Sequence, residues 1–262
     1  PREMRGPTNA AILPILRERI GAAPVAIVSR TLRTTGIGES ALAERLGELG
    51  KFVSGMPLAF LPGWAGVDLR LTSRTLPPDA AERALDDAER TLRDVAGPVV
   101  YGKGSDDLAE LVLGMCRERA LHIATAESCT GGLLGARLTA IPGSSDVYTG
   151  GVIAYDNSVK TKLLGVSDVT LEEHGAVSEQ VAREMAEGCA RVLGTALGIG
   201  LTGIAGPGGG TPEKPVGTVW IAVAGIGKTR TLGRAYVGDR EEIRQRAAQA
   251  SLDQVRRAIV SA

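Results

Sequence analysis

Three segments of the sequence combine nucleophilic, basic and glycine-rich residues at points where a strand is expected to end. The first, residues 126–132 (A-E-S-C-T-G-G), leads from a strand through a hydroxyl-rich turn into a helix. N–H groups at the start of a helix converge on an anion, and the helix dipole favours negative charge there. The segment therefore offers Ser128 as a nucleophile and Thr130, Gly131 and Gly132 as anion-binding residues. A plain capping turn, with Ser128 or Thr130 as N-cap, is the alternative.

The second segment, residues 150–160 (G-G-V-I-A-Y-D-N-S-V-K), again leads from a strand through a cap into a helix. If Asp156 or Asn157 caps the helix, Lys160 lies in its first turn, where the positive end of the dipole disfavours an ammonium group. This placement lowers the pKa of the lysine, as a lysine general base requires. The alternative is an ordinary solvated lysine. Lys162 lies two residues further and should face elsewhere, which makes it the weaker candidate.

The third segment, residues 201–217 (L-T-G-I-A-G-P-G-G-G-T-P-E-K-P-V-G), carries a buried strand into a loop of glycine and proline. Glycine lets the backbone approach a ligand closely, and successive N–H groups can form a nest for an anion. Thr202, Gly203 and Gly206 are the candidate contacts. A flexible loop is the alternative, although three prolines stiffen the segment. With the pairs at 131–132 and 150–151, this run is expected to gather glycine at one edge of a sheet.

Other matches to catalytic motifs are weaker. Residues 225–229 (G-I-G-K-T) resemble the end of a P-loop, but Ala222 stands in the place of its first glycine and a hairpin turn is expected there. Residues 36–41 (G-I-G-E-S-A) are interpreted as a turn into a helix, because the surrounding unit is too small for a dinucleotide fold. His174 could serve a serine nucleophile, although a polar loop or core histidine is the more common case.

The elements that must position these residues follow from hydrophobic periodicity. Between 25 and 101 the order is β-α-β-β-α-β, with strands expected at 25–28, 58–61, 67–71 and 99–101 and helices at 40–49 and 77–95. Residues 106–260 alternate helices with buried strands and include a hairpin over 216–237. This predicts an α/β fold: a three-layer α/β/α sandwich with a mixed sheet, preceded by a small α+β domain. The expected domains are 23–104 and 105–262, after a helix within 1–22 that remains from a missing N-terminal domain.

Composition narrows the function classes. Lys+Arg and Asp+Glu are both 30, so the net charge is zero, and aromatic residues are only 3% of the 262. A general nucleic-acid binder needs a basic surplus and stacking aromatics, so nucleic acid is not an expected partner. The three cysteines and two histidines lack metal-ligand spacing, which predicts no metal and no cofactor. No membrane-spanning run and no secretory signal are found, so a cytoplasmic protein that does not bind membranes is expected.

Taken together, the motifs resemble a known family. The three segments, with H-G-A-V-S at 174–178 and G-D-R at 238–240, are similar in type and order to the C-terminal domain of CinA (competence/damage-inducible) proteins, over residues 105–262. Residues 23–104 resemble the KH-like middle domain of those proteins, and residues 1–22 resemble the end of their N-terminal domain. KH domains bind nucleic acid through a G-x-x-G loop. The matches at 47–50 and 63–66 contain no basic residue, so a spacer or dimerisation module is predicted instead.

The resemblance implies a nicotinamide mononucleotide deamidase, which hydrolyses the carboxamide to nicotinate mononucleotide and ammonia. It implies Ser128 as nucleophile and Lys160 as general base, with Tyr155 nearby, and it suggests a homodimer. The oxyanion donors would come from Thr130 to Gly132 or from Thr202-Gly203, and the substrate phosphate would meet the glycine-rich loop or Arg240. The alternative function is a non-catalytic nucleotide-sensing or protein-interaction module in competence or the DNA damage response.

Overall fold

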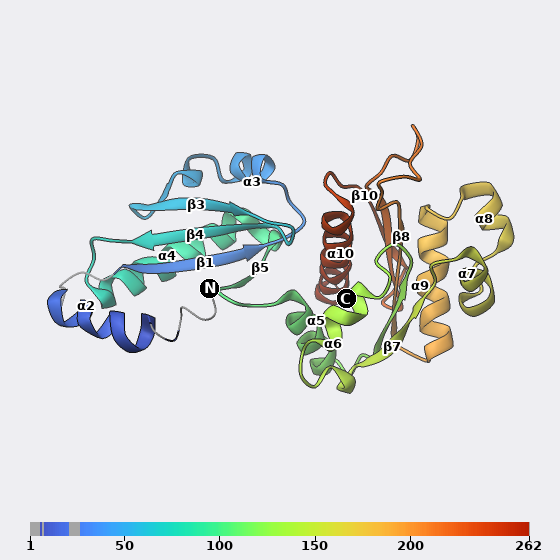
Figure 1. Cartoon of the computed structure of the whole chain (residues 1–262), viewed down its shortest axis with the longest axis horizontal. Coiled ribbons are helices and arrows are strands. Elements are labelled where there is room, and N and C mark those ends of the chain that lie inside the picture. The colour runs from blue at the N-terminus through green and yellow to red at the C-terminus, as the bar shows by residue number, and fades with distance from the viewer. Residues whose placement is uncertain (1–5, 7, 21–26, 262) are drawn as a thin grey trace.

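The structure, a computed structural model, describes residue 6 and residues 8–20 and 27–261. It contains two separate five-stranded sheets, one in each half of the chain (Figure 1). The expected helix over 8–20 is present as a π-helical turn, η1 (Thr8–Ile12), followed by α2 (Leu13–Ile20). Within these described ranges, no helix is both long enough and apolar enough to cross a membrane.

The first sheet is entirely antiparallel, with the strand order β2-β3-β4-β1-β5. Its elements are β1 (Val28–Thr34), α3 (Glu39–Leu46), η2 (Gly47–Gly50), β2 (Phe52–Val53), β3 (Met56–Pro62), β4 (Val67–Ser73), α4 (Pro78–Ala96), η3 (Gly97–Val99) and β5 (Val100–Lys103). The predicted element order is confirmed, apart from the two-residue β2, which is too short to give a periodic signal.

The first strand was predicted at 25–28, and of the described residues in that range only Val28 lies in a strand. Residues 25 and 26 lie outside the described ranges, and β1 begins at Val28. Only Leu32 and Thr34 of β1 are fully buried, while Arg30 and Arg33 form ion pairs with acidic side chains of neighbouring elements. A strand with so polar a sequence lacks the apolar run that marked 25–28.

The second sheet is mixed, as predicted, with the order β10-β9-β8-β6-β7. Its strands are β6 (Ile123–Glu127), β7 (Tyr148–Ile153), β8 (Leu197–Gly203), β9 (Thr218–Ala224) and β10 (Arg230–Ala235). The strand β6 is parallel to both β7 and β8, and the β9–β10 hairpin is antiparallel, with residues 225–229 in its turn. The hairpin position confirms that residues 225–229 do not form a P-loop.

Helices cover both faces of this sheet, which confirms the three-layer sandwich (Figure 1). One layer holds α5 (Leu108–Glu118), α6 (Leu133–Thr139) and α10 (Arg240–Val260), and a short turn, η4 (Ser144–Asp146), precedes β7. The other layer holds α7 (Asn157–Leu164), α8 (Asp168–His174) and α9 (Glu179–Leu193). The helix α8 was not predicted, because its seven residues bury no side chain and carry no apolar stripe.

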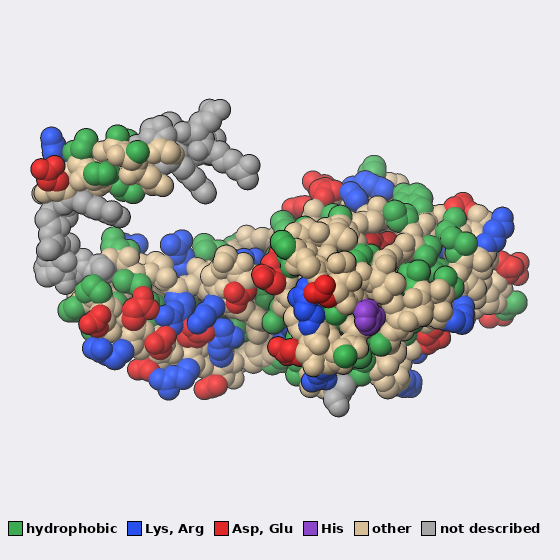
Figure 2. Space-filling model, turned by 90° about the horizontal axis from the view of Figure 1, so that it is seen from below, with side chains coloured by type: hydrophobic (Ala, Val, Ile, Leu, Met, Phe, Trp, Pro, Cys, Tyr) green, Lys and Arg blue, Asp and Glu red, His purple; other side chains and the backbone are tan. Residues whose placement is uncertain are grey.

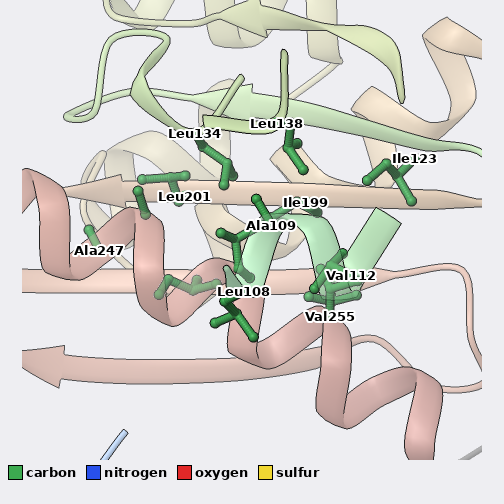
Figure 3. Close-up of a cluster of buried hydrophobic side chains, with 14 of the residues drawn as sticks. Leu108, Ala109, Val112, Ile123, Leu134, Leu138, Ile199, Leu201, Ala247 and Val255 are labelled. Atoms are coloured by element: carbon green, nitrogen blue, oxygen red, sulfur yellow. The ribbon is translucent and has the colours of Figure 1, made fainter. Parts of the chain in front are cut away.

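The two faces of the sheet are packed differently. Large aliphatic side chains fill the space between the sheet and α5, α6 and α10, among them Val112, Leu134 and Leu201 (Figure 3). On the other face, a Cβ atom added to Gly200 would lie 2.3 Å from the carbonyl oxygen of Ala182 in α9. The backbone of α9 therefore lies directly against β8, which only a side-chain-free residue permits.

The helix α10 also joins the two halves of the molecule (Figure 1). Arg256 Nη2 donates a hydrogen bond to the carbonyl oxygen of Pro98 at 2.6 Å, and the Gln249 amide contacts Thr35. The turn between β3 and β4 carries Trp64, whose ring centroid lies 5.2 Å from the guanidinium carbon of Arg137 in α6. The G-x-x-G match at 63–66 is therefore part of the contact between the domains.

Candidate functional site

The strands β6, β7 and β8 end at the same edge of the second sheet, because they run parallel. In the register of the sheet, Glu127 at the end of β6 lies between Ile153 of β7 and Leu201 of β8. The ladder continues one step beyond, since Ala154 N donates to Glu127 O at 2.8 Å and Ser128 N donates to Leu201 O at 3.1 Å. All three predicted segments therefore meet at this edge.

The turn that carries Ser128 is organised by the carboxylate before it. Glu127 is only 2% exposed, and it accepts hydrogen bonds from Thr130 Oγ1 at 2.6 Å and from the N–H groups of Gly132, Leu134 and Gly135 at 3.1, 3.0 and 2.8 Å. The protein's own carboxylate thus fills the anion position at the start of α6. The N–H group of Gly132 is therefore already occupied, and the role of Gly132 in substrate binding stays a prediction. The signal that was overlooked is an acidic residue placed directly before the serine at a strand end.

Two N–H groups next to Ser128 stay available. The N–H group of Gly131 is not available to a ligand, because it donates a hydrogen bond to Ser128 O at 3.1 Å. The N–H groups of Cys129 and Thr130 donate to no other residue in the part of the chain that the structure describes. Of the predicted donors Thr130, Gly131 and Gly132, only Thr130 therefore has a free N–H group.

The side chain of Lys160 is buried, although it carries an amine. Asp156 caps α7 by accepting from Ser158 N at 2.8 Å, which places Lys160 in the first turn. Lys160 is 1% exposed, and its Nζ donates to Tyr155 O at 3.1 Å and to Asn157 Oδ1 at 3.3 Å. Burial lowers the pKa of this amine, and the nearby Asp156 offsets only part of the effect. Burial and a lowered pKa are properties that a lysine base needs, although no hydrogen bond joins Lys160 to Ser128 among the described residues. Lys162, in contrast, is exposed.

Arg240, the first residue of α10, connects two other predicted residues. Its Nη1 donates to the carbonyl oxygen of Gly206 at 2.6 Å, and its Nη2 donates to the hydroxyl of Tyr155 at 3.1 Å. One turn further along the helix, Arg244 Nη2 donates to the carbonyl oxygen of Thr130 at 2.8 Å. The start of α10 therefore holds all three segments together. Sequence reasoning identified Arg240 but overlooked Arg244, which forms no motif.

Thr202 and Gly203 contribute packing at this edge. Thr202 Oγ1 donates to the carbonyl oxygen of Ala176 at 2.8 Å. Thr202 and Gly203 both pair with residues of β9. A Cβ atom on Gly203 would lie 3.1 Å from Cys129 Sγ and 2.9 Å from the carbonyl oxygen of Thr218. Glycine is thus required for the turn after Ser128 to approach β8.

Two further expectations concern glycine and histidine. Gly151 lies within β7, two residues before the end of the strand. A Cβ atom added to Gly151 would lie 2.2 Å from Thr125 Oγ1, so this glycine allows β7 to pack closely against β6. His174 ends α8 with its ring partly exposed and 3.8 Å from a Glu173 oxygen. Its carbonyl oxygen accepts from Lys214 Nζ at 2.6 Å, which ties the glycine-rich loop to α8. No hydrogen bond joins His174 to Ser128 among the described residues.

The cysteine beside the serine is an unsuitable nucleophile. Burial raises the pKa of the Cys129 thiol to about 12, so it stays protonated at neutral pH. Over residues 8–20 and 27–261, no group of three or more His, Cys, Asp or Glu side chains could hold a metal ion. The chemistry that this edge offers is therefore a buried hydroxyl, a buried amine and free backbone donors.

Comparison with known proteins gives matches over both halves of the chain. A family model described as the CinA C-terminal domain matches residues 105–259, and one described as the damage-inducible protein CinA KH domain matches residues 29–102. A CinA-like protein of Gemmatimonas aurantiaca is 60% identical over 98% of this chain, and one of Salinibacter ruber is 46% identical over 99%. The chain spans 60% and 62% of the lengths of these two relatives.

Solved structures match a little more than half of the chain. A competence/damage-inducible protein from Agrobacterium tumefaciens has a TM-score of 0.57 and 39% identity, and covers 58% of this chain and 93% of its own. A CinA superfamily protein from Escherichia coli has a TM-score of 0.55 and 36% identity, and covers 56% of this chain and 86% of its own. These coverages correspond to a stand-alone domain like the one that contains Ser128 and Lys160.

Proposed function

The chain belongs to the CinA family, and on that premise we propose that its C-terminal domain hydrolyses the carboxamide of nicotinamide mononucleotide to nicotinate mononucleotide and ammonia. The family resemblance suggests the substrate. The observation that carries the proposal is the burial of Lys160, with a lowered pKa, at the sheet edge where Ser128 leaves β6. A buried amine without a carboxylate partner is costly to a fold, so its presence at a cluster of polar residues points to catalysis.

In the first half of the reaction, the neutral Lys160 amine accepts the hydroxyl proton of Ser128 as Ser128 Oγ attacks the carboxamide carbon. The resulting oxyanion needs donors that are already fixed in place. We assign this role to the N–H groups of Cys129 and Thr130, which donate to no other described residue and lie in a turn fixed by Glu127. When the C–N bond breaks, the Lys160 ammonium returns its proton to the leaving nitrogen, and ammonia departs.

The second half releases the product from the ester on Ser128. Neutral Lys160 accepts a proton from a water molecule as that water attacks the ester carbon. The C–O bond to Ser128 then breaks, and the Lys160 ammonium returns its proton to Ser128 Oγ. The product is formed as the carboxylic acid, loses its remaining proton to solvent and leaves as nicotinate mononucleotide. Lys160 therefore alternates between base and acid, which is most effective when its pKa lies close to the working pH.

The substrate phosphate is assigned to Arg240. This guanidinium donates hydrogen bonds to the carbonyl oxygen of Gly206 and to the hydroxyl of Tyr155, which belong to two of the three segments that meet at the sheet edge. Tyr155 is 61% exposed, so the pair can be reached from solvent. Arginine forms charge-assisted hydrogen bonds with phosphate, and the glycine-rich loop beside it leaves room for a ligand to approach.

The direct test is ammonia release from nicotinamide mononucleotide by the purified chain. We expect turnover by the native chain, with Ser128→Ala and Lys160→Ala each lowering kcat by about 10²–10⁴-fold. Lys162→Ala is the matched control and should retain the native rate. Full activity in Lys160→Ala together with loss in His174→Ala would replace the Ser–Lys mechanism by a Ser–His one. Saturable binding of the substrate without ammonia release would instead favour the non-catalytic alternative.

A further inference from the structure

A cleft of about 810 Å³ lies between the two domains, away from the edge that holds Ser128. One side is formed by the loops after β1 and β3, and the other by β10 and α10. Small-molecule sites typically occupy roughly 300–1,000 Å³ and occur preferentially between domains. None of the residues assigned to the deamidase site lines this cleft, so an inference about it is independent of the proposed function.

The lining of the cleft is positively charged, in a chain whose net charge is zero. Four arginines and two acidic residues line it: Arg45, Arg234, Arg246, Arg257, Glu39 and Asp253. The carboxylate of Asp253 is already shared between Arg256 and Arg257. Across the described residues, Arg234 and Arg246 have no acidic partner within salt-bridge distance. Two guanidinium groups are thus free to bind an anion.

Two buried polar atoms in the cleft also lack a partner. Arg246 Nε and Gln249 Oε1 are inaccessible to solvent and form no hydrogen bond within the described part of the chain. Gln249 is 2% exposed, and the other end of its amide donates to Thr35 Oγ1 at 3.4 Å, which holds it in place. Buried polar groups are normally satisfied, so a donor and an acceptor left open in the wall of one cavity mark that cavity as a candidate ligand site.

Aromatic rings complete the lining. Trp64 and Tyr236 both face the cleft, although the whole chain has only two tryptophans and four tyrosines. Burial raises the pKa of Tyr236 to about 12, and the charges of Arg234 and Arg246 offset part of that rise. Such rings favour stacking with a planar heterocycle.

We propose that this interdomain cleft binds a mononucleotide. Its phosphate would pair with Arg234 and Arg246, and its base would lie against the aromatic lining. The size of the cleft suits one nucleotide and excludes a folded partner.

The two tryptophans provide a local test. Trp64 lines the cleft and Trp220 lies in β9 outside it, so the Trp220→Phe variant reports on the cleft alone. With AMP as the probe, we expect a saturable change in the Trp64 fluorescence of this variant, with a matching heat of binding by calorimetry. Trp64→Phe should lose the fluorescence change. If Trp64 fluorescence shows no saturation with millimolar AMP, the cleft is merely hydrated and the proposal fails.

Charge variants test the assignment of the phosphate. Arg234 is exposed and hydrogen-bonds only to its neighbour Gly233, so Arg234→Ala should fold normally. It should weaken AMP binding by about tenfold, as should Arg246→Ala, because each removes a charge-assisted hydrogen bond. Arg230→Ala, on the same strand but outside the cleft, is the matched control and should bind AMP like the native chain. Equal binding by Arg234→Ala and the native chain would overturn the phosphate assignment.

Simpler probes separate the two halves of the ligand. Adenosine and inorganic phosphate should each bind at least tenfold more weakly than AMP, since each makes only part of the contacts. Inorganic phosphate that competes as well as AMP would overturn the mononucleotide assignment, because the base would then contribute nothing.

Discussion

Charged side chains in the two domains include two opposite cases. In the first, Arg30 of β1 pairs with Glu82, Asp86 and Glu89 of α4, and acidic and basic side chains are intermingled over that domain's surface (Figure 2). In the second, Glu127 and Lys160 are almost completely buried, and neither forms an ion pair with a described residue. They are held instead by backbone groups and an amide.

The exposed charges form ion pairs at the surface of the protein, whereas the two buried charges belong to the candidate site. Exposed ion pairs contribute little to stability, because water solvates both partners nearly as well. A buried charge costs free energy unless its hydrogen-bonding groups are satisfied, and an amine can reduce that cost by losing its proton. The hydrogen bonds to Glu127 are an example of the first case, and the lowered pKa of Lys160 favours the second. The buried pair should therefore respond to substitution in different ways.

The largest effect should come from Lys160→Met, which keeps the length of the side chain and removes the amine. In the proposed reaction, kcat should fall by about 10²–10⁴-fold, because the proposed general base is lost. Stability should be unchanged or higher, since no amine remains to be buried. Ammonia release and urea unfolding measure the two effects on the same sample. A large loss of stability would show instead that Lys160 is mainly structural.

Glu127→Ala, in contrast to Lys160→Met, should mainly lower the free energy of unfolding. Four donors would be left without an acceptor, at a cost of about 3 kcal/mol in the free energy of unfolding. Glu127→Gln keeps one carbonyl acceptor and should lose about half as much. Urea unfolding at neutral pH provides the measurement, with Glu110→Ala on the exposed side of α5 as the matched control. Native stability in Glu127→Ala would contradict the capping role.

The pH dependence of stability should reveal the titration of Lys160. Its pKa is lowered in the folded state from the ordinary 10.5, so between the two values the unfolded chain binds more protons. Stability therefore rises with pH across this window. Below the lowered pKa both states are protonated, and the folded state bears the full cost of the buried ammonium. Lys160→Met should have its largest stability advantage there, and the advantage should shrink as the pH approaches 10.5.

The smallest effect is expected in the first domain. Arg30→Ala removes three ion pairs, but Glu82 and Asp86 are more than half exposed, and Glu89 keeps its contact with Arg93. The free energy of unfolding should fall by about 1 kcal/mol or less, and the difference should decrease in high salt. Urea unfolding at low and high ionic strength measures this. A loss as large as that of Glu127→Ala would remove the contrast between the two domains.

Much of this architecture could be predicted from the sequence. Periodicity identified the amphipathic α4, whose residues Leu85 and Leu92 are buried, and the apolar run of β8. Elements without an apolar pattern were missed or misplaced, namely β1, β2 and α8. In β1 the reason is visible: ion pairs from another element make Arg30 and Arg33 compatible with a strand, and no local pattern reports a partner more than thirty residues away.

At the candidate site, the sequence by itself determined which residue types follow each strand: Ser128, the Lys160 segment and the glycine-rich loop. It also determined the cap that puts Lys160 in a first helical turn, because this depends only on neighbours in the chain. Only the tertiary structure decided which groups remain free to act. Glu127 occupies the amides of α6, Arg240 connects Tyr155 to Gly206, and burial removes Lys160 from water. Solvation and the choice of hydrogen-bond partner depend on segments distant in the sequence, so they arise only when the three layers pack together.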